Sequence, residues 1–199
     1  MYTLVSGAYR YLTRHDEYTV LILGLDNSGK TTLLESLKHE YTGVLGMDPQ
    51  KIQPTVGVNI ARLRINKRVL RCMDLGGQAD LRGIWQSYFR DAHALLFVVD
   101  ASDSARMAEA QGALVGLARA AELANMPVLV LANKQDATDV RAVAQVKEMV
   151  NSVADELDPR AVRVVGASGI DGSGTRDAID WLFSRVVENS ALRPPVATE

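Results

Sequence analysis

The segment that most constrains the fold of this chain is residues 24–31, GLDNSGKT, in which two glycines stand five positions apart and Lys-Thr follows the second. An apolar run precedes it and a stretch of helix length follows. A strand, a glycine-rich turn and a helix in this order point backbone N–H groups and the positive end of the helix at one place. The segment therefore predicts a phosphate-binding loop (P-loop); a chance match in a glycine-rich turn is roughly a one per cent event.

Each polar position of the P-loop has a predicted role. Lys30 is expected to reach the β and γ phosphates of a nucleotide, and Thr31 to place its hydroxyl on Mg²⁺, a hard cation that prefers oxygen ligands. The loop residues predicted to contact the nucleotide are Asp26, Asn27, Ser28, Gly29, Lys30, Thr31 and Thr32.

The rest of the chain alternates apolar strand-like runs with stretches of helix length. The runs 18–23, 94–99, 128–132 and 162–165 are too uniformly apolar to have one face in water, which predicts buried parallel strands. Runs 59–65 and 69–73 alternate instead, and the turn between them predicts an antiparallel hairpin at a sheet edge. Together with helices expected near 30–40, 105–123, 140–157 and 176–187, this predicts a doubly wound α/β fold.

Asp74 closes the second run of the hairpin and is followed by Leu-Gly-Gly-Gln. This places a carboxylate where a second Mg²⁺ ligand is needed. The N–H of Gly77 is suited to the γ phosphate, and Gln78 to orienting an attacking water. Alone, the segment would be an ordinary turn signal. The upstream P-loop makes a catalytic reading the stronger one, with Gln78 and Lys30 as the catalytic residues.

Residues 133–136, Asn-Lys-Gln-Asp, follow the buried run 128–132 and so lie at the carboxyl end of a parallel strand, where open α/β sheets bind ligands. The carboxylate of Asp136 can accept hydrogen bonds from N1–H and the exocyclic amine of guanine, whereas adenine offers no matching pair. Asn133, Lys134 and Asp136 are therefore predicted to bind a guanine base. The alternative, a polar loop with no ligand, is common for such a tetrapeptide in isolation.

These motifs, in this order, resemble the ADP-ribosylation factor family of small GTPases, and the resemblance covers nearly the whole chain. It rests on GLDNSGKT, PTVG at 54–57, DLGGQ at 74–78, Trp85 and NKQD at 133–136. The first four residues and the longer stretch 43–53 are most similar to the ADP-ribosylation factor-related protein branch. The resemblance implies a P-loop small GTPase fold with a mostly parallel six-stranded sheet, one antiparallel edge hairpin and helices on both faces.

The resemblance also implies a switch that cycles between GDP and GTP forms. Thr55, in the segment called switch I, would contact Mg²⁺ and the γ phosphate, so the expected metal set is Thr31, Thr55 and Asp74. Hydrolysis would proceed by in-line attack of water and would be slow without an activating protein. Arg82 and Arg90, near the segment called switch II that begins at Asp74, are interpreted as core or partner contacts more readily than as catalytic groups.

The expected organisation is an amphipathic helix at 1–16, a GTPase domain at 17–190 and a flexible tail at 191–199. Apolar residues recur at helical spacing in the first segment. By the resemblance, it would be acetylated and bound by a Golgi membrane receptor, which makes the chain cytoplasmic and peripheral at the Golgi or trans-Golgi membrane in its GTP form. The alternative is a helix that packs on the core in every state.

Two departures from the family pattern affect its surfaces. The three positions where family members present aromatic side chains to effectors hold Val58, Met73 and Tyr88. The loop after the last strand is Gly-Ala-Ser-Gly, and Ser168 and Gly169 are the ungapped choice for base contacts through a backbone N–H, with Ala167 left open.

Composition narrows the partners and leaves two rival functions. A chain of 199 residues with a formal charge of −2 predicts one domain without an electrostatic footprint for nucleic acid, and we expect a monomer regulated by an exchange factor. One cysteine, Cys72, allows no internal disulfide and is expected in a core strand. The rivals are a module that loads GTP without hydrolysing it, and a P-loop ATPase or phosphotransferase, which Asp136 opposes.

Overall fold

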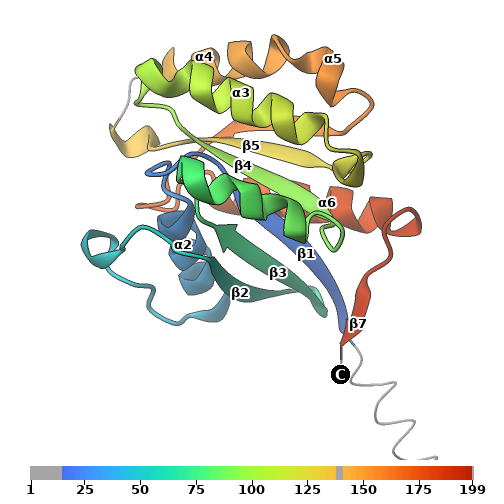
Figure 1. The fold of residues 1–199 in the computed structure, drawn as a ribbon. Coiled ribbons are helices and arrows are strands. Elements are labelled where there is room, and N and C mark those ends of the chain that lie inside the picture. Colours follow the sequence, from blue (N-terminus) through green and yellow to red (C-terminus); the bar gives the residue numbers. More distant parts are fainter. Residues whose placement is uncertain (1–14, 138–140, 199) are drawn as a thin grey trace, which may run out of the picture.

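The computed structural model describes residues 15–137 and 141–198, which fold around one sheet with the order β2-β3-β1-β4-β5-β6. A seventh strand, β7, pairs with β1 outside this order, and Figure 1 shows the sheet between two layers of helices. All pairs are parallel except β2–β3 and β1–β7. The strands are β1 (His15–Leu23), β2 (Val58–Ile65), β3 (Arg68–Leu75), β4 (Ala94–Asp100), β5 (Val128–Asn133), β6 (Val162–Gly166) and β7 (Val196–Thr198).

Two hydrophobic cores lie on the two faces of the sheet. One packs the sheet against α2 (Lys30–Thr42) and α6 (Thr175–Glu188). The other packs it against α3 (Met107–Ala118), α4 (Arg141–Asn151), α5 (Ala154–Leu157) and the 3₁₀ segment η2 (Ala79–Tyr88). Because helices cover both faces, β1, β4 and β5 are buried on both sides, which explains their unbroken apolar sequences. The predicted α/β architecture is confirmed.

Two of the expected helices are shorter than the sequence pattern indicated. The stretch 105–123 forms α3 flanked by short 3₁₀ turns, because the guanidinium of Arg160 donates to the carbonyl oxygens of Ala118 at 2.7 Å and Leu123 at 3.2 Å and so ends the helix. The stretch 140–157 divides into α4 and α5. There the hydroxyl of Ser152 donates to the Met149 carbonyl at 2.6 Å, a local bond that competes with helix continuation.

The hairpin of β2 and β3 is confirmed at the sheet edge. Its turn is formed by Asn66 and Lys67, both with positive φ (48° and 65°), the combination that matches the twist of the strands it joins. Cys72 is buried on β3, as expected.

The sheet has one strand more than the six expected. β7 lies within residues 191–199, the expected tail, and pairs antiparallel with His15–Glu17 at the start of β1. The same pairing explains why His15 and Asp16, assigned to the N-terminal helix by the sequence pattern, belong to a strand instead. Residues 1–14 of that helix lie outside the described residues. Within the described part of the chain, no helix is long and apolar enough to cross a membrane.

The side chain of His93 hydrogen-bonds to the edge of β1 between the parts of that strand that pair with β7 and with β4. The backbone N–H of Thr19 donates to Nδ1 of the buried His93 at 2.9 Å, while Nε2 lies 3.0 Å from the carbonyl oxygen of Pro194. Because Nδ1 accepts a hydrogen bond, the proton is on Nε2 and the ring is neutral. Arg193 adds a hydrogen bond from Nη1 to the Ala92 carbonyl at 2.8 Å. Residues 189–198 thus form a C-terminal strap fastened to the sheet.

The neutral ring of His93 predicts acid sensitivity. Burial lowers its pKa below the ordinary value of 6.5, with Arg193 acting in the same direction and Asp91 opposing. The folded state therefore binds fewer protons than the unfolded state, so this stabilisation is complete above about pH 6.5 and is lost as the pH falls through the lowered pKa. In denaturation between pH 7.5 and 5, we expect His93→Gln to lose less stability than the wild type. His39→Gln, at an exposed position, is the control; an unchanged pH dependence in His93→Gln would contradict the assignment.

Candidate functional site

The P-loop lies against the sheet so closely that two of its residues have no space for a side chain. A Cβ on Gly24 (φ 148°) would lie 2.2 Å from the carbonyl oxygen of Val98, and one on Gly29 (φ 90°) would lie 2.3 Å from Nδ2 of Asn133. Both φ values are in the region that favours glycine. The loop therefore runs directly over the carboxyl ends of the strands and delivers the first turn of α2 to the same place.

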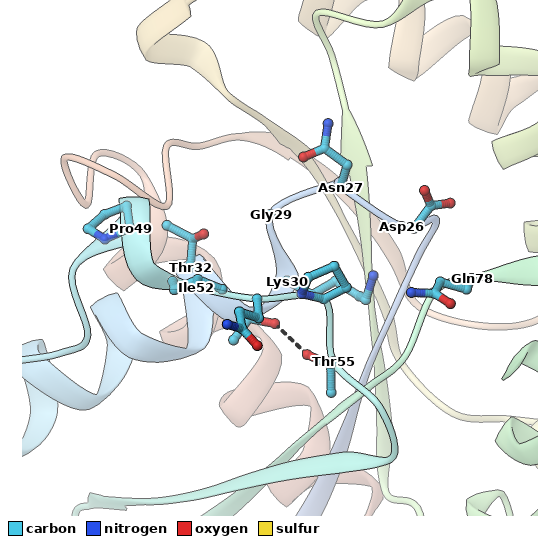
Figure 2. Close-up of a pocket in the computed structure, with 13 residues that line it drawn as sticks. Asp26, Asn27, Gly29, Lys30, Thr32, Pro49, Ile52, Thr55 and Gln78 are labelled. Carbon is cyan, nitrogen blue, oxygen red and sulfur yellow. Dashed lines mark hydrogen bonds between the residues drawn. The ribbon is translucent and has the colours of Figure 1, made fainter.

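A cavity of about 260 Å³ opens beside this loop (Figure 2). Its walls come from the P-loop, from the segment before β2 and from the segment after β3. The lining residues are Asp26, Asn27, Gly29, Lys30, Thr31, Thr32, Pro49, Ile52, Gln53, Pro54, Thr55, Gly77 and Gln78. Nine of these thirteen were predicted at the nucleotide, and the structure brings them together. Ser28 is also in the loop, but its side chain is buried away from the cavity wall, which leaves its backbone as the available contact.

Lys30 is buried at the start of α2, and its Nζ donates to the carbonyl oxygen of Leu25 at 2.6 Å. Burial lowers the pKa of this ammonium to about 8, and the nearby carboxylate of Asp74 opposes the shift. A polyphosphate in the cavity would favour the charged form and raise the pKa again. The side chain is thus a cation held in the cavity wall by the loop itself.

Three side-chain oxygens meet at the floor of the cavity. The hydroxyl of Thr31 donates to Oδ2 of Asp74 at 2.6 Å and lies 2.8 Å from the hydroxyl of Thr55, which is 3.3 Å from the same carboxylate oxygen. Asp74 is fully buried, its Oδ1 has no hydrogen-bond partner among the residues that the structure describes, and burial raises its pKa. One carboxylate and two hydroxyls, with an unsatisfied oxygen among them, fit Mg²⁺, which takes few protein ligands and completes its shell with phosphate and water.

The two glycines after Asp74 are held in place by side chains from η2. The indole N–H of Trp85 donates to the carbonyl of Gly76 at 2.9 Å, and Nε of Arg82 donates to the carbonyl of Gly77 at 2.9 Å. A Cβ on Gly77 would lie 2.5 Å from Nζ of Lys30, so this residue packs directly on the P-loop. Gln78 is exposed and lines the cavity.

The predicted base-binding residues form a second cluster, built around Asn133. Its Nδ2 donates to the carbonyl of Ser28 at 2.8 Å, and its Oδ1 accepts from the N–H of Gly169 at 3.0 Å. The side chain therefore joins the P-loop to the loop after β6. Lys134, with φ 66°, extends its ammonium to Asp100 at 2.6 Å, an ion pair at the ends of β4 and β5.

Asp136 faces Ser168, whose hydroxyl donates to its Oδ1 at 2.6 Å. The three backbone N–H groups that the sequence left open as base contacts are all hydrogen-bonded in the protein. Ala167 donates to the carbonyl of Ala132 and Ser168 to that of Ser173, both at 3.0 Å, whereas the partner of Gly169 is the side chain of Asn133. The partners of Ala167 and Ser168 are backbone carbonyls, whereas the partner of Gly169 is a side chain that can turn away, so Gly169 is the N–H best placed to be released to a ligand.

Sequence reasoning missed the residues that anchor Asp26. Arg106, before α3, donates from Nη2 to Oδ1 of Asp26 at 2.7 Å and from Nε to Glu109 at 2.9 Å. A lone arginine and glutamate three positions apart on a helix are an ordinary surface pattern, so no local signal distinguished them. Arg82 donates to the carbonyl of Gly77, a contact within the protein, and Arg90 is exposed.

The three positions compared with the family's effector-facing aromatics differ in exposure. Val58 and Tyr88 are partly exposed, and Met73 is buried in the core. Apolar side chains are exposed nearby instead, at Val56 (82%) and Ile60 (41%).

The site combines three features. They are a P-loop with a buried lysine, an oxygen cluster from two threonines and an aspartate, and an Asn-Lys-x-Asp segment at the carboxyl end of β5. Together these features define a small GTPase. A family model described as the ADP-ribosylation factor family matches residues 5–186. The chain belongs to this family, whose members hydrolyse GTP.

Individual relatives agree with this assignment. The chain is 41% identical over 197 residues to ADP-ribosylation factor-like protein 3 of Saccharomyces cerevisiae, covering 98% of this chain and 99% of that protein. It is 39% identical over 196 residues to human ADP-ribosylation factor-related protein 1, covering 98% and 97%. Among solved structures, the Arl6 BBS3 small GTPase of Trypanosoma brucei, with the bound nucleotide analogue GppNp, matches at a TM-score of 0.73 with 26% identity, covering 86% of this chain and 98% of that one.

The double contact of Asn133 yields a stability prediction. Asn133→Ala would leave the buried carbonyl of Ser28 and the buried N–H of Gly169 without partners, so we expect a loss of roughly 1–3 kcal/mol in the free energy of unfolding. Chemical denaturation without nucleotide measures it, with Asn151→Ala, at an exposed position, as the control. Equal stabilities of the two variants would show that the link between the loops carries no energy.

Proposed function

We propose that this protein is a magnesium-dependent guanine-nucleotide switch, which recruits effectors when loaded with GTP and returns to the GDP form by slow hydrolysis that an activating protein accelerates. The single observation that carries the proposal is the meeting of Thr31, Thr55 and Asp74 beside the P-loop. Thr55 lies in a segment far from the other two in sequence. Its hydroxyl joins the other two side chains across 24 and 19 residues of sequence, which supports closure of switch I over a shared ligand.

The metal site follows from the same three residues. Thr31, Thr55 and Asp74 would hold Mg²⁺, which would supply positive charge to offset the phosphates. In that role the Thr31 and Thr55 hydroxyls would give up their mutual hydrogen bond, and the buried carboxylate of Asp74, whose Oδ1 has no hydrogen-bond partner among the described residues, would supply negative charge to the metal.

The remaining residues bind and orient the substrate. Lys30 and the backbone N–H groups of residues 27–32 bind phosphate oxygens, and the N–H of Gly77 binds the γ phosphate. Gln78 orients a water for in-line attack, and its exposure at the cavity leaves it accessible to an activating protein.

Base recognition falls to the cluster around Asn133. The carboxylate of Asp136 accepts two hydrogen bonds from guanine, while Ser168 holds that carboxylate in position at 2.6 Å. The N–H of Gly169 would leave Asn133 and donate to the base. The side chain of Lys134, held by its ion pair with Asp100, would lie over one face of the base.

The switch surface is suited to effectors. Val56, next to Thr55 in the chain, and Ile60, on β2, expose apolar side chains, so movement of Thr55 would alter the shape of this apolar surface. The family resemblance of residues 1–14 supports a site of action at the Golgi membrane in vesicle transport, with a membrane receptor, an exchange factor and an activating protein as partners.

Guanine specificity tests the nucleotide assignment. Asp136→Asn is expected to weaken GDP and GTP binding by at least about 100-fold, because a carboxylate that accepts two hydrogen bonds is lost, and to improve relative binding of xanthosine diphosphate. Titration calorimetry with GDP, ADP and xanthosine diphosphate, each with and without Mg²⁺, measures the change. Asp155→Asn, at an exposed position on α5, is the matched control. Wild-type protein that binds ADP as tightly as GDP would refute the proposal.

The membrane role has its own test. A chain lacking residues 1–14 is expected to keep its nucleotide affinity and to lose association of the GTP form with Golgi membranes, because this segment and its receptor are proposed to supply that binding. Co-sedimentation of GTP-loaded protein with isolated membranes measures it, with the GDP-loaded full chain as the control. Unchanged association of the shortened chain would exclude this role for the segment.

A further inference from the structure

A closed ring of hydrogen bonds connects the P-loop, switch II and α3 on the side of the cavity away from Thr55. It consists of Asp26, Arg106, Glu109, Arg82 and the carbonyl oxygen of Gly77. Arg106 binds Oδ1 of Asp26 at 2.7 Å and Glu109 at 2.9 Å; Arg82 binds the other oxygen of Glu109 at 2.6 Å and the Gly77 carbonyl at 2.9 Å. The N–H of Asp26 closes the ring by donating to the same carbonyl at 3.2 Å.

The charges of the ring balance, two guanidiniums against two carboxylates. The hydrogen bond from Arg106 holds the pKa of Asp26 below its ordinary value, and Arg106 with Arg82 lowers the pKa of Glu109 to about 2. Asp26 lines the cavity, where an unpaired carboxylate would repel an anionic phosphate. The ring therefore cancels a charge that the P-loop would otherwise direct at its own ligand.

The ring also fixes the backbone that carries the water-orienting residue. The peptide unit between Gly77 and Gln78 contains the Gly77 carbonyl, so two donors on that oxygen set its plane. The preceding unit is set by Trp85, which binds the Gly76 carbonyl and so directs the N–H of Gly77. Glycine has no Cβ to restrict either plane, so these external contacts replace the missing steric restraint.

We propose that Arg82 and Glu109 are positioning residues for GTP hydrolysis: through the ring they hold the Gly77–Gln78 peptide so that Gln78 meets the attacking water. The inference rests on the proposed function and deepens it. Glu109 lies on α3, outside the cavity, and acts on the reaction only through the two arginines. Arg82 points its guanidinium at this carboxylate and at the Gly77 carbonyl, so it acts through the backbone and not as a charge on the phosphate.

The test separates the hydrogen bonds that the guanidinium of Arg82 makes on two sides from its positive charge. Arg82→Lys keeps a cation for Glu109 but lacks the Nε–H that binds the Gly77 carbonyl. We expect the single-turnover rate of hydrolysis of preloaded GTP to fall about tenfold, the effect of losing roughly one hydrogen bond, with GDP affinity within about twofold of the wild type. Glu109→Gln, which weakens both arginine contacts at a partly exposed position, is expected to slow hydrolysis in the same direction.

Arg90→Lys is the matched control, because Arg90 is an exposed arginine near switch II that is outside the ring. Hydrolysis at the control rate in both Arg82→Lys and Glu109→Gln would overturn the inference. A loss of GDP affinity parallel to the loss of rate would also overturn it, because the ring would then serve only as a structural tie. Failure of the wild type itself to retain GDP with Mg²⁺ would be a different result, which refutes the proposed function.

Discussion

The architecture of the site depends on how closely the P-loop approaches the carboxyl ends of the strands. At Gly24 and Gly29 the backbone lies where any Cβ would overlap the Val98 carbonyl or the amide of Asn133. This contact fixes the distance between the loop and the ends of the strands. Lys30 and Thr31, the first residues of α2, therefore occupy fixed positions, and the base cluster is joined to the phosphate cluster through the single side chain of Asn133.

The two clusters differ in how they are held. Around Asn133 and Ser168 the hydrogen bonds tie three loops together, and in the proposed base complex only the contact of Asn133 with Gly169 is given up. Thr55 and the Gly76–Gly77 segment, in contrast, are held by side-chain contacts that a ligand can replace. A more constrained base cluster beside replaceable contacts around Thr55 and Gly77 is what the proposed switch requires, since the contacts nearest the terminal phosphate are the ones that would respond to its presence.

Much of this was predictable from the sequence because the motifs are local. The P-loop, the hairpin and the buried strands follow from glycine spacing and apolar periodicity, and the confirmed α/β order follows from their alternation. The ring residues Arg106 and Glu109 could not be predicted from the sequence, because other partners of theirs are distant in the chain and the spacing between the two is ordinary. The helix breaks near Ala118 and Ser152, and the pairing of β7, likewise depend on tertiary contacts that periodicity does not encode.

The C-terminal strap has a practical consequence for work in cells. Because β7 runs along His15–Glu17, a fluorescent protein appended to the C-terminus would be tethered beside the point where residues 1–14 join the sheet. Such a reporter would crowd any receptor or lipid bilayer that those residues engage. Mislocalisation of a C-terminally labelled chain is therefore weak evidence about where the unlabelled protein resides, and an internal label on the opposite end of the sheet would be the sounder choice.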